Sequence, residues 1–126
     1  MGRQVISTPD VPRSPYFAQG VKAGSQIWVS GMAGIDPLTG ELAGAGIKEQ
    51  ALQALANCER VVAVGGGTRQ DIVEVGVLLA DPDDFAGLNE VFEGHFGDDP
   101  PVRYVARLGP VLPGVRVSIR MTAVLG

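Results

Sequence analysis

The strongest structural signal in this sequence is a helical pattern of apolar residues between Ile47 and Val64. Apolar side chains recur there every three or four residues, a spacing that lines them along one helical face: Ala51, Leu52, Leu55, Cys58, Val61 and Val62. Three consecutive glycines, residues 65–67, end the pattern, because glycine weakens a helix and provides the left-handed geometry of a helix C-terminus. We therefore expect a helix over residues 47–64 with one apolar face.

Several β-rich runs surround this helix. Residues 72–79 form an apolar run rich in β-branched side chains, too continuous for an exposed edge, and it predicts a central strand. Residues 17–21 and 26–30 are separated by four turn-forming residues, which favours an antiparallel hairpin. The remaining expected strands are residues 5–8, 102–108 and 115–124, the last with alternating apolar and polar residues.

A second helix is expected to start at Asp81-Pro82-Asp83-Asp84 and to run to about Phe96. These residues combine an N-cap, a proline in the first turn and acids at the positive end of the helix dipole. The resulting order, β-β-β-α-β-α-β-β, contains two split βαβ halves. It predicts an α+β fold in which a mixed sheet carries both helices on one face.

Length and composition limit the possible organisation. A chain of 126 residues fits one domain, residues 1–126, with a sizeable core. Hydrophobic residues make up 45% and charged residues 19%, which argues against disorder and suggests that another subunit covers apolar surface. The formal charge of -4, with scattered basic residues, argues against a nucleic-acid partner.

Other function classes are disfavoured by what the sequence lacks. No apolar run approaches the roughly 20 residues of a membrane helix, and no apolar signal region follows Met1, so a cytoplasmic location is expected. Cys58 is the single cysteine, cannot form an internal disulfide and is expected to be buried. No His/Cys cluster offers a zinc site, and no metal or cofactor is expected.

The strand-like run Pro101–Leu108 carries an arginine near its start. The apolar residues around Arg103 predict that this part of the strand is buried. A guanidinium cannot lose its proton, so it is seldom buried without an anion. That anion is either a carboxylate of the protein or a ligand.

Together with Ser14-Pro15-Tyr16, Val29-Ser30-Gly31 and the segment Asp84-Phe85-Ala86-Gly87-Leu88-Asn89, this run resembles the RidA family, also called YjgF or L-PSP. The similarity spans nearly the whole chain. It implies a chorismate-mutase-like α+β domain that forms a homotrimer with ligand clefts between neighbouring subunits. It also implies hydrolysis of reactive 2-enamino or 2-imino acids to 2-keto acids and ammonia.

The resemblance gives residues their expected roles. Arg103 would hold the carboxylate of an imino or keto acid, while backbone groups near Val105 (its carbonyl) and Gly31 would position water. Tyr16 would wall the pocket, and Asn89 would touch the ligand or orient a loop. Each residue also has a structural alternative. Arg103 would form an ion pair at a subunit interface, and Tyr16 would be a packing residue. Gly31 would occupy a β-bulge, and Asn89 would support the local structure.

One position departs from the family. In imine-hydrolysing members a glutamate on the last strand helps to hold the attacking water, and the aligned residue here is Arg120. We expect either a slow or substrate-shifted hydrolase, or a non-catalytic trimeric protein that binds a small carboxylate or phosphate between Arg103 and Arg120. A nuclease role is disfavoured by the acidic balance. His95, near the end of the second helix where we expect it to be solvated, is not expected to be catalytic.

Overall fold

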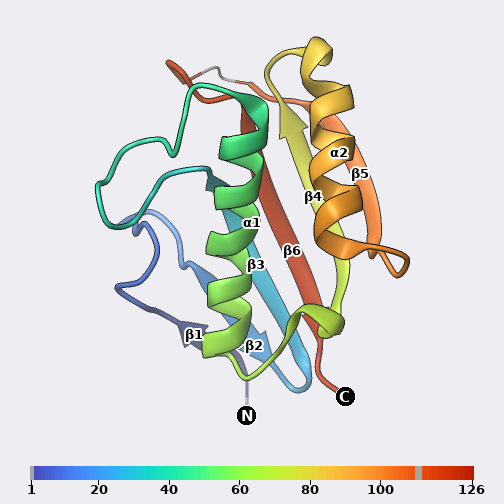
Figure 1. Cartoon of the computed structure of the whole chain (residues 1–126). Helices are drawn as coiled ribbons and strands as arrows, with labels where there is room; N and C mark the ends of the chain where they lie inside the picture. Colours follow the sequence, from blue (N-terminus) through green and yellow to red (C-terminus); the bar gives the residue numbers. More distant parts are fainter. Residues whose placement is uncertain (1, 110–111) are drawn as a thin grey trace.

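The computed structural model describes residues 2–109 and 112–126 as a two-layer arrangement of strands and helices (Figure 1). The helices are α1 (Ile47–Val64) and α2 (Phe85–Phe96), with short 3-10 turns η1 (Arg69–Asp71) and η2 (Pro82–Asp84). The strands are β1 (Gln4–Ile6), β2 (Gly20–Ala23), β3 (Gln26–Ala33), β4 (Ile72–Leu79), β5 (Val102–Arg107) and β6 (Val117–Val124).

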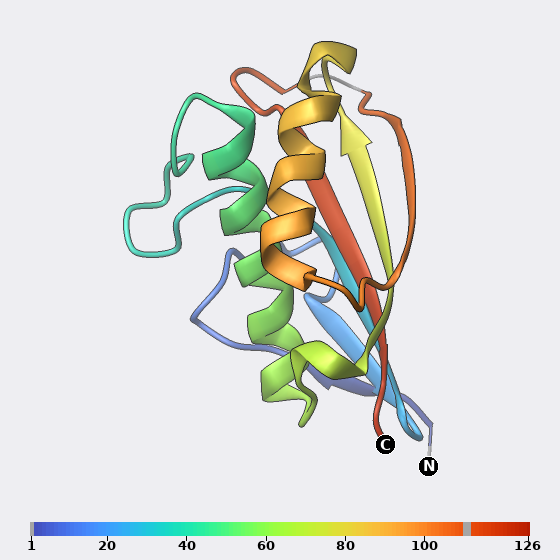
Figure 2. The ribbon, with the colours of Figure 1, turned by 45° about the vertical axis from the view of Figure 1, so that its right-hand side comes forward.

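The strands form one mixed sheet in the order β1-β2-β3-β6-β4-β5. Neighbouring strands are antiparallel except β4 and β5, which are parallel. Both helices cover the same face of the sheet, and the opposite face is left open (Figure 2). The predicted order of elements and the predicted α+β fold are confirmed.

The core lies between the helices and the sheet. In β6 the alternation is regular: Val117, Ile119, Met121 and Ala123 are fully buried, whereas the residues between them face the open side. The apolar face of α1 packs on this layer as predicted, except Leu52, which remains half exposed at the margin of that face. Cys58 is buried as expected, and its thiol donates to the Ile119 carbonyl at 3.2 Å.

The hairpin has a different register from the predicted one. Ala23 pairs with Gln26, so the turn is two residues long and not four. Gly24 takes its first position with φ +58°, a conformation that glycine adopts without strain. The first strand therefore starts and ends later than expected, at Gly20 and Ala23, whereas the second starts at Gln26 as predicted and continues to Ala33.

A buried glutamine fastens two loops at one end of the sheet. Gln50 lies on α1, and its Nε2 donates to the carbonyls of Gly44 and Gly114 at 2.9 Å each. Its Oε1 accepts from the backbone N–H of Arg116 at 2.8 Å. These bonds satisfy the amide, as burial of a polar group requires. Within the described residues, neither helix is long and apolar enough to cross a membrane.

Candidate functional site

Arg103 lies on β5 with its side chain toward the helices. It pairs in register with the buried Val75, and its guanidinium carbon stands 4.9 Å from the ring centroid of Phe92 and 5.6 Å from that of Phe85. These distances are typical of cation–π contacts. Helical spacing places Asn89 between the two aromatic residues on the same face of α2.

No acidic side chain of residues 2–109 and 112–126 neutralises Arg103. The guanidinium makes neither an ion pair nor a hydrogen bond with these residues, and it is only half buried. The aromatic rings hold it in place without compensating its charge. Its donors are thus available to an anion, which a guanidinium can bind through two parallel hydrogen bonds.

The predicted burial of the strand around Arg103 is wrong. Val102 is 69% exposed and Tyr104 is 46% exposed. The reason is the position of β5 at the edge of the sheet, where it pairs with β4 alone and no second layer covers its open face.

A hollow of about 650 Å³ lies at the end of β5, beside the start of α2. Phe85 lines it together with the next inward residue of β5, Val105. The other lining residues are Leu79, Ala80, Pro82, Ala106 and Arg107. Since Phe85 also contacts Arg103, a small acid held by the guanidinium could lay its apolar part against this wall.

Tyr16 and Gly31 lie on other elements than Arg103, in the loop before β2 and on β3 respectively. Gly31 occupies a β-bulge, the register shift between Val29 and Met32, so the structural alternative for this glycine is found. Tyr16 is 90% exposed in the loop that leads to β2. β6 and β4 separate β3 from β5, so one protomer carries two separate groups of candidate residues. The first group is Arg103, Val105 and Asn89, and the second is Tyr16 and Gly31.

Arg120 lies on the open face of the sheet. It pairs with Gly76 and stands opposite the bulge, and its Nη1 donates to the hydroxyl of Tyr104 at 3.2 Å. Its Nη2 is 3.7 Å from Oε1 of Glu74. Arg103 faces the helices, so within a protomer the two arginines do not converge on one cleft.

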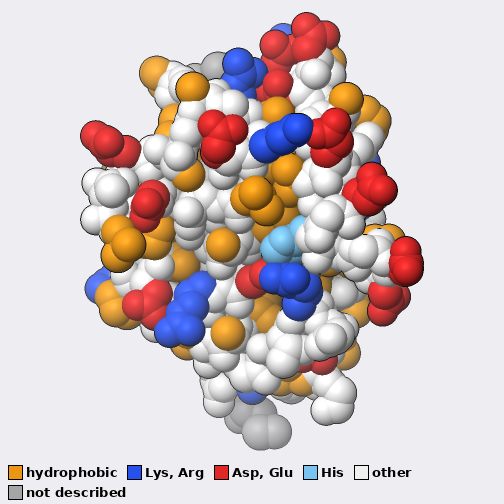
Figure 3. Space-filling view, in the orientation of Figure 1, with side chains coloured by type: hydrophobic (Ala, Val, Ile, Leu, Met, Phe, Trp, Pro, Cys, Tyr) orange, Lys and Arg blue, Asp and Glu red, His pale blue; other side chains and the backbone are white. Residues whose placement is uncertain are grey.

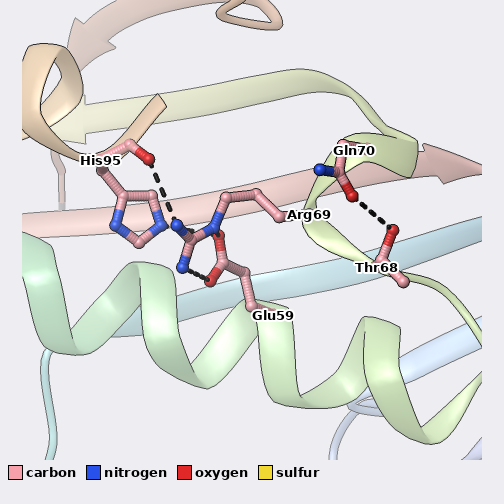
Figure 4. A network of polar contacts seen from close by, with 5 residues as sticks. All are labelled: Glu59, Thr68, Arg69, Gln70 and His95. Carbon is pink, nitrogen blue, oxygen red and sulfur yellow. Dashed lines mark hydrogen bonds and ion pairs between the residues drawn. The ribbon is translucent and has the colours of Figure 1, made fainter. Parts of the chain in front are cut away.

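His95 is not solvated as expected. Its Nε2 lies 2.7 Å from Oε2 of Glu59 on α1, and Arg69 of η1 binds both oxygens of the same carboxylate at 3.1 Å (Figure 4). Glu59 precedes His95 by 36 residues, so no local pattern reveals the pair. This network ties α1, η1 and α2 together.

The helix side of the molecule is mixed in charge. Basic and acidic side chains alternate over it, and hydrophobic side chains line the groove between the helices beside His95 (Figure 3). Among the described residues, no three His, Cys, Asp or Glu side chains are grouped to hold a metal ion.

A mixed six-stranded sheet with both helices on one face places the chain in the class of two-layer α+β proteins. The comparisons identify the family within that class. The chain belongs to the Endoribonuclease L-PSP family, also called RidA or YjgF, whose sequence model matches residues 8–125. The resemblance inferred from the sequence is thereby confirmed.

Relatives align over nearly their full length. The mouse 2-iminobutanoate/2-iminopropanoate deaminase is 36% identical over 126 residues, covering 98% of this chain and 93% of the relative. A RutC family protein of Pyrococcus horikoshii is 34% identical, covering 96% and 97%.

Solved structures share the fold. RidA from an Antarctic Psychrobacter superposes with a TM-score of 0.89 at 34% identity, covering 97% of this chain and 99% of the other. TdcF of Escherichia coli with bound serine gives a TM-score of 0.90 at 30% identity, covering 98% and 99%. The chain thus has the RidA/YjgF fold.

Proposed function

We propose that this protein hydrolyses reactive 2-enamino or 2-imino acids to 2-keto acids and ammonia. The observation that carries the proposal is the half-buried guanidinium of Arg103, which lies beside two aromatic rings and forms an ion pair with no acid in the described part of the chain. Relatives named 2-iminobutanoate/2-iminopropanoate deaminase support the reaction, and a related structure that holds serine supports a site of amino-acid size.

The reaction needs little acid or base chemistry from side chains. Arg103 binds the substrate carboxylate, and the backbone carbonyl of Val105 with backbone groups at Gly31 orients a water molecule. The water oxygen forms a bond to the carbon of the protonated imine, and the C=N electron pair moves to nitrogen. Loss of a proton from the added water and proton transfer to the amino group give a carbinolamine with a protonated amino group. Cleavage of the C–N bond then releases ammonia, while the oxygen forms the C=O bond of the keto acid and its remaining proton passes to solvent.

A homotrimer would bring the separated groups together. In this arrangement Tyr16 and Gly31 of one protomer complete the cleft that contains Arg103 of its neighbour. Support comes from the open face of the sheet, where apolar and aromatic side chains lack a covering layer: Val5, Trp28, Val102, Tyr104 and Val124. Such surface is typical of subunit contacts.

Arg120 is expected to make the enzyme slow or to change its substrate. A guanidinium has only donors, so it cannot accept a hydrogen bond from the attacking water as the family's glutamate would. Positioned acid or base groups contribute about two to four powers of ten. We expect an Arg120→Glu variant to hydrolyse imines faster than the natural protein.

The test uses 2-iminobutanoate or 2-iminopropanoate formed in place by an amino-acid oxidase, with keto acid formation followed over time. The natural protein should accelerate hydrolysis, and Arg103→Ala should abolish the acceleration. Arg3→Ala removes the same charge from an exposed position before β1 and serves as the matched control. Absence of any acceleration by the natural protein overturns the proposal.

The alternative is a non-catalytic protein that binds a small carboxylate or phosphate. It is favoured by Arg120 opposite the bulge at Gly31, because a neighbouring protomer could combine this cation with its own Arg103. Calorimetry with a monocarboxylate and a dicarboxylate distinguishes the two functions. Tight binding of the dicarboxylate without imine hydrolysis would establish the alternative.

A further inference from the structure

We infer that Gln19 is a positioning residue for the proposed reaction: it fixes the backbone of the loop of residues 8–16, and thereby the place at which Tyr16 meets the site of a neighbouring protomer. The inference rests on the proposed function, since Tyr16 is taken there as part of the cleft. Gln19 itself would not touch the substrate.

The side chain of Gln19 holds one end of the loop to the other. It is only 4% exposed, and its Oε1 accepts from the backbone N–H of Thr8 at 2.8 Å. Its Nε2 donates to the carbonyls of Thr8 at 3.0 Å, Val11 at 3.1 Å and Pro12 at 3.0 Å. An amide has two donor hydrogens, so these carbonyls share them and the group is fully used.

The backbone of the same residue is joined to the bulge. The carbonyl of Gln19 accepts from the N–H of Ser30 at 2.9 Å, and the hydroxyl of Ser30 donates to the carbonyl of Ala18 at 2.6 Å. Ser30 directly precedes Gly31 in the chain. Gln19 therefore connects the loop that carries Tyr16 with the second candidate residue of the same group.

A third set of contacts restrains the middle of the loop. Val11 is buried in the core, and Oδ2 of Asp10 accepts from Nε and Nη2 of Arg60 on α1 at 2.8 and 2.6 Å. The loop is thus fastened at several points although it has no regular secondary structure.

The aromatic residues at the end of this loop have no comparable support. Tyr16 is 90% exposed and Phe17 is more than half exposed, next to a glutamine that is almost inaccessible. A loop whose backbone is already fixed loses little backbone entropy when a partner covers its exposed aromatic groups. This contrast between a buried polar anchor and exposed rings favours a role in presenting Tyr16 over a role in stability alone.

A double-mutant cycle tests the inference. The quantity measured is kcat/KM for 2-iminobutanoate in the natural protein, Gln19→Leu, Tyr16→Ala and the double variant. We expect each single change to lower kcat/KM by about tenfold or more, and the double variant to match Tyr16→Ala within about twofold. The inference would be overturned if the losses of the two single variants multiply in the double variant, or if Gln19→Leu does not change kcat/KM.

Gln50→Leu is the matched control, because Gln50 is the other buried glutamine that fastens loops, and its loops do not carry Tyr16. Any loss of kcat/KM that it causes should multiply with the loss from Tyr16→Ala. If Gln19→Leu does not fold, Gln19→Glu keeps the shape and the acceptor oxygen, removes the donors to the three carbonyls, and enters the same cycle.

Failure of the proposed function can be told apart from failure of this inference. If the natural protein does not hydrolyse the imine, the same four proteins are compared by their calorimetric affinity for 2-oxobutanoate. The inference is supported without hydrolysis if Gln19→Leu lowers the affinity of the natural protein for 2-oxobutanoate but does not lower that of the Tyr16→Ala variant further. Absence of both hydrolysis and binding in the natural protein overturns both proposals.

Discussion

The ring of Tyr104 lies directly over Gly76 on the open face of the sheet. A Cβ atom on Gly76 would stand 2.7 Å from the Tyr104 hydroxyl oxygen and 2.8 Å from its ring carbons. The missing side chain lets the ring cross β4, so that a hydroxyl from β5 accepts a hydrogen bond from Arg120 on β6. The orientation of Arg120 therefore depends on a glycine of the strand between them.

Gly76→Ala is expected to destabilise the protein by no more than about 1 kcal/mol, because the methyl group displaces the half-exposed ring of Tyr104 and breaks its hydrogen bond with Arg120, while the lower backbone entropy of alanine offsets part of the cost. The control is Gly94→Ala in α2, where an added Cβ meets no atom within 4 Å. That change should stabilise the fold by about 0.5–1 kcal/mol through helix propensity. Urea denaturation of both variants checks the prediction, and equal stabilities would contradict it.

Arg103→Lys is expected to restore little of the activity lost in Arg103→Ala. An ammonium cannot bind a carboxylate through two parallel hydrogen bonds, and it lacks the planar group that lies near Phe85 and Phe92. We expect kcat/KM for 2-iminobutanoate to fall about 10- to 100-fold, the equivalent of one charge-assisted hydrogen bond. A lysine variant as active as the natural protein would refute the two-bond geometry.

Cys58 is expected to resist alkylation in the native protein. The thiol is fully buried, it donates to a backbone carbonyl, and burial raises its pKa, so almost no thiolate forms at pH 8. Iodoacetamide should modify the chain only after unfolding, as followed by mass spectrometry. A Cys58→Ala, Leu38→Cys variant, with its thiol at a position that is 93% exposed, should react at once.

His95→Ala is expected to reduce stability and to leave imine hydrolysis unchanged. His95 and Glu59 are mostly buried and join α2 to α1, so removing the imidazole should cost roughly 1–3 kcal/mol. Lys48→Ala breaks an exposed ion pair with Glu90 between the same helices and should cost only about 0–1 kcal/mol. Thermal unfolding and the imine assay together check both statements.

The Asp10–Arg60 ion pair is expected to weaken in acid. Its hydrogen bond with Arg60 holds the pKa of Asp10 below its usual range. A lowered folded-state pKa means that the contribution is complete above the unfolded-state pKa and is lost as pH falls through the folded-state value. The stability difference between the natural protein and Asp10→Asn should therefore be larger at neutral pH than in acid, as measured by urea denaturation at several pH values.

Patterns of apolar residues along the chain predicted the long helix and the central strand correctly. The helix over residues 47–64 and the strand over residues 72–79 have the predicted bounds, because long apolar patterns end there at glycine or at turn residues. The bounds predicted for the hairpin were wrong, because four consecutive residues with turn propensity do not specify which two of them form the turn.

The surroundings of the site could not be predicted in the same way. Whether Val102 is exposed depends on strand order, and β5 contains no residue pattern that marks it as an edge. The rings beside Arg103 belong to α2, and the bonds of Gln19 reach residues 7 to 11 positions earlier in an irregular loop. Such contacts arise only when separate elements pack together.

The aromatic setting of Arg103 has a consequence for experiments in solution. When an arginine forms an internal salt bridge, an incoming acid must first displace the carboxylate. Arg103 lies beside aromatic rings instead, so an acid can bind it without displacing an anion of the protein. Chloride, phosphate and sulfate from ordinary buffers are then direct competitors for the vacant donors. Apparent substrate affinity should fall steadily with the concentration of these anions, and the tightest binding will be seen in media that contain the fewest of them.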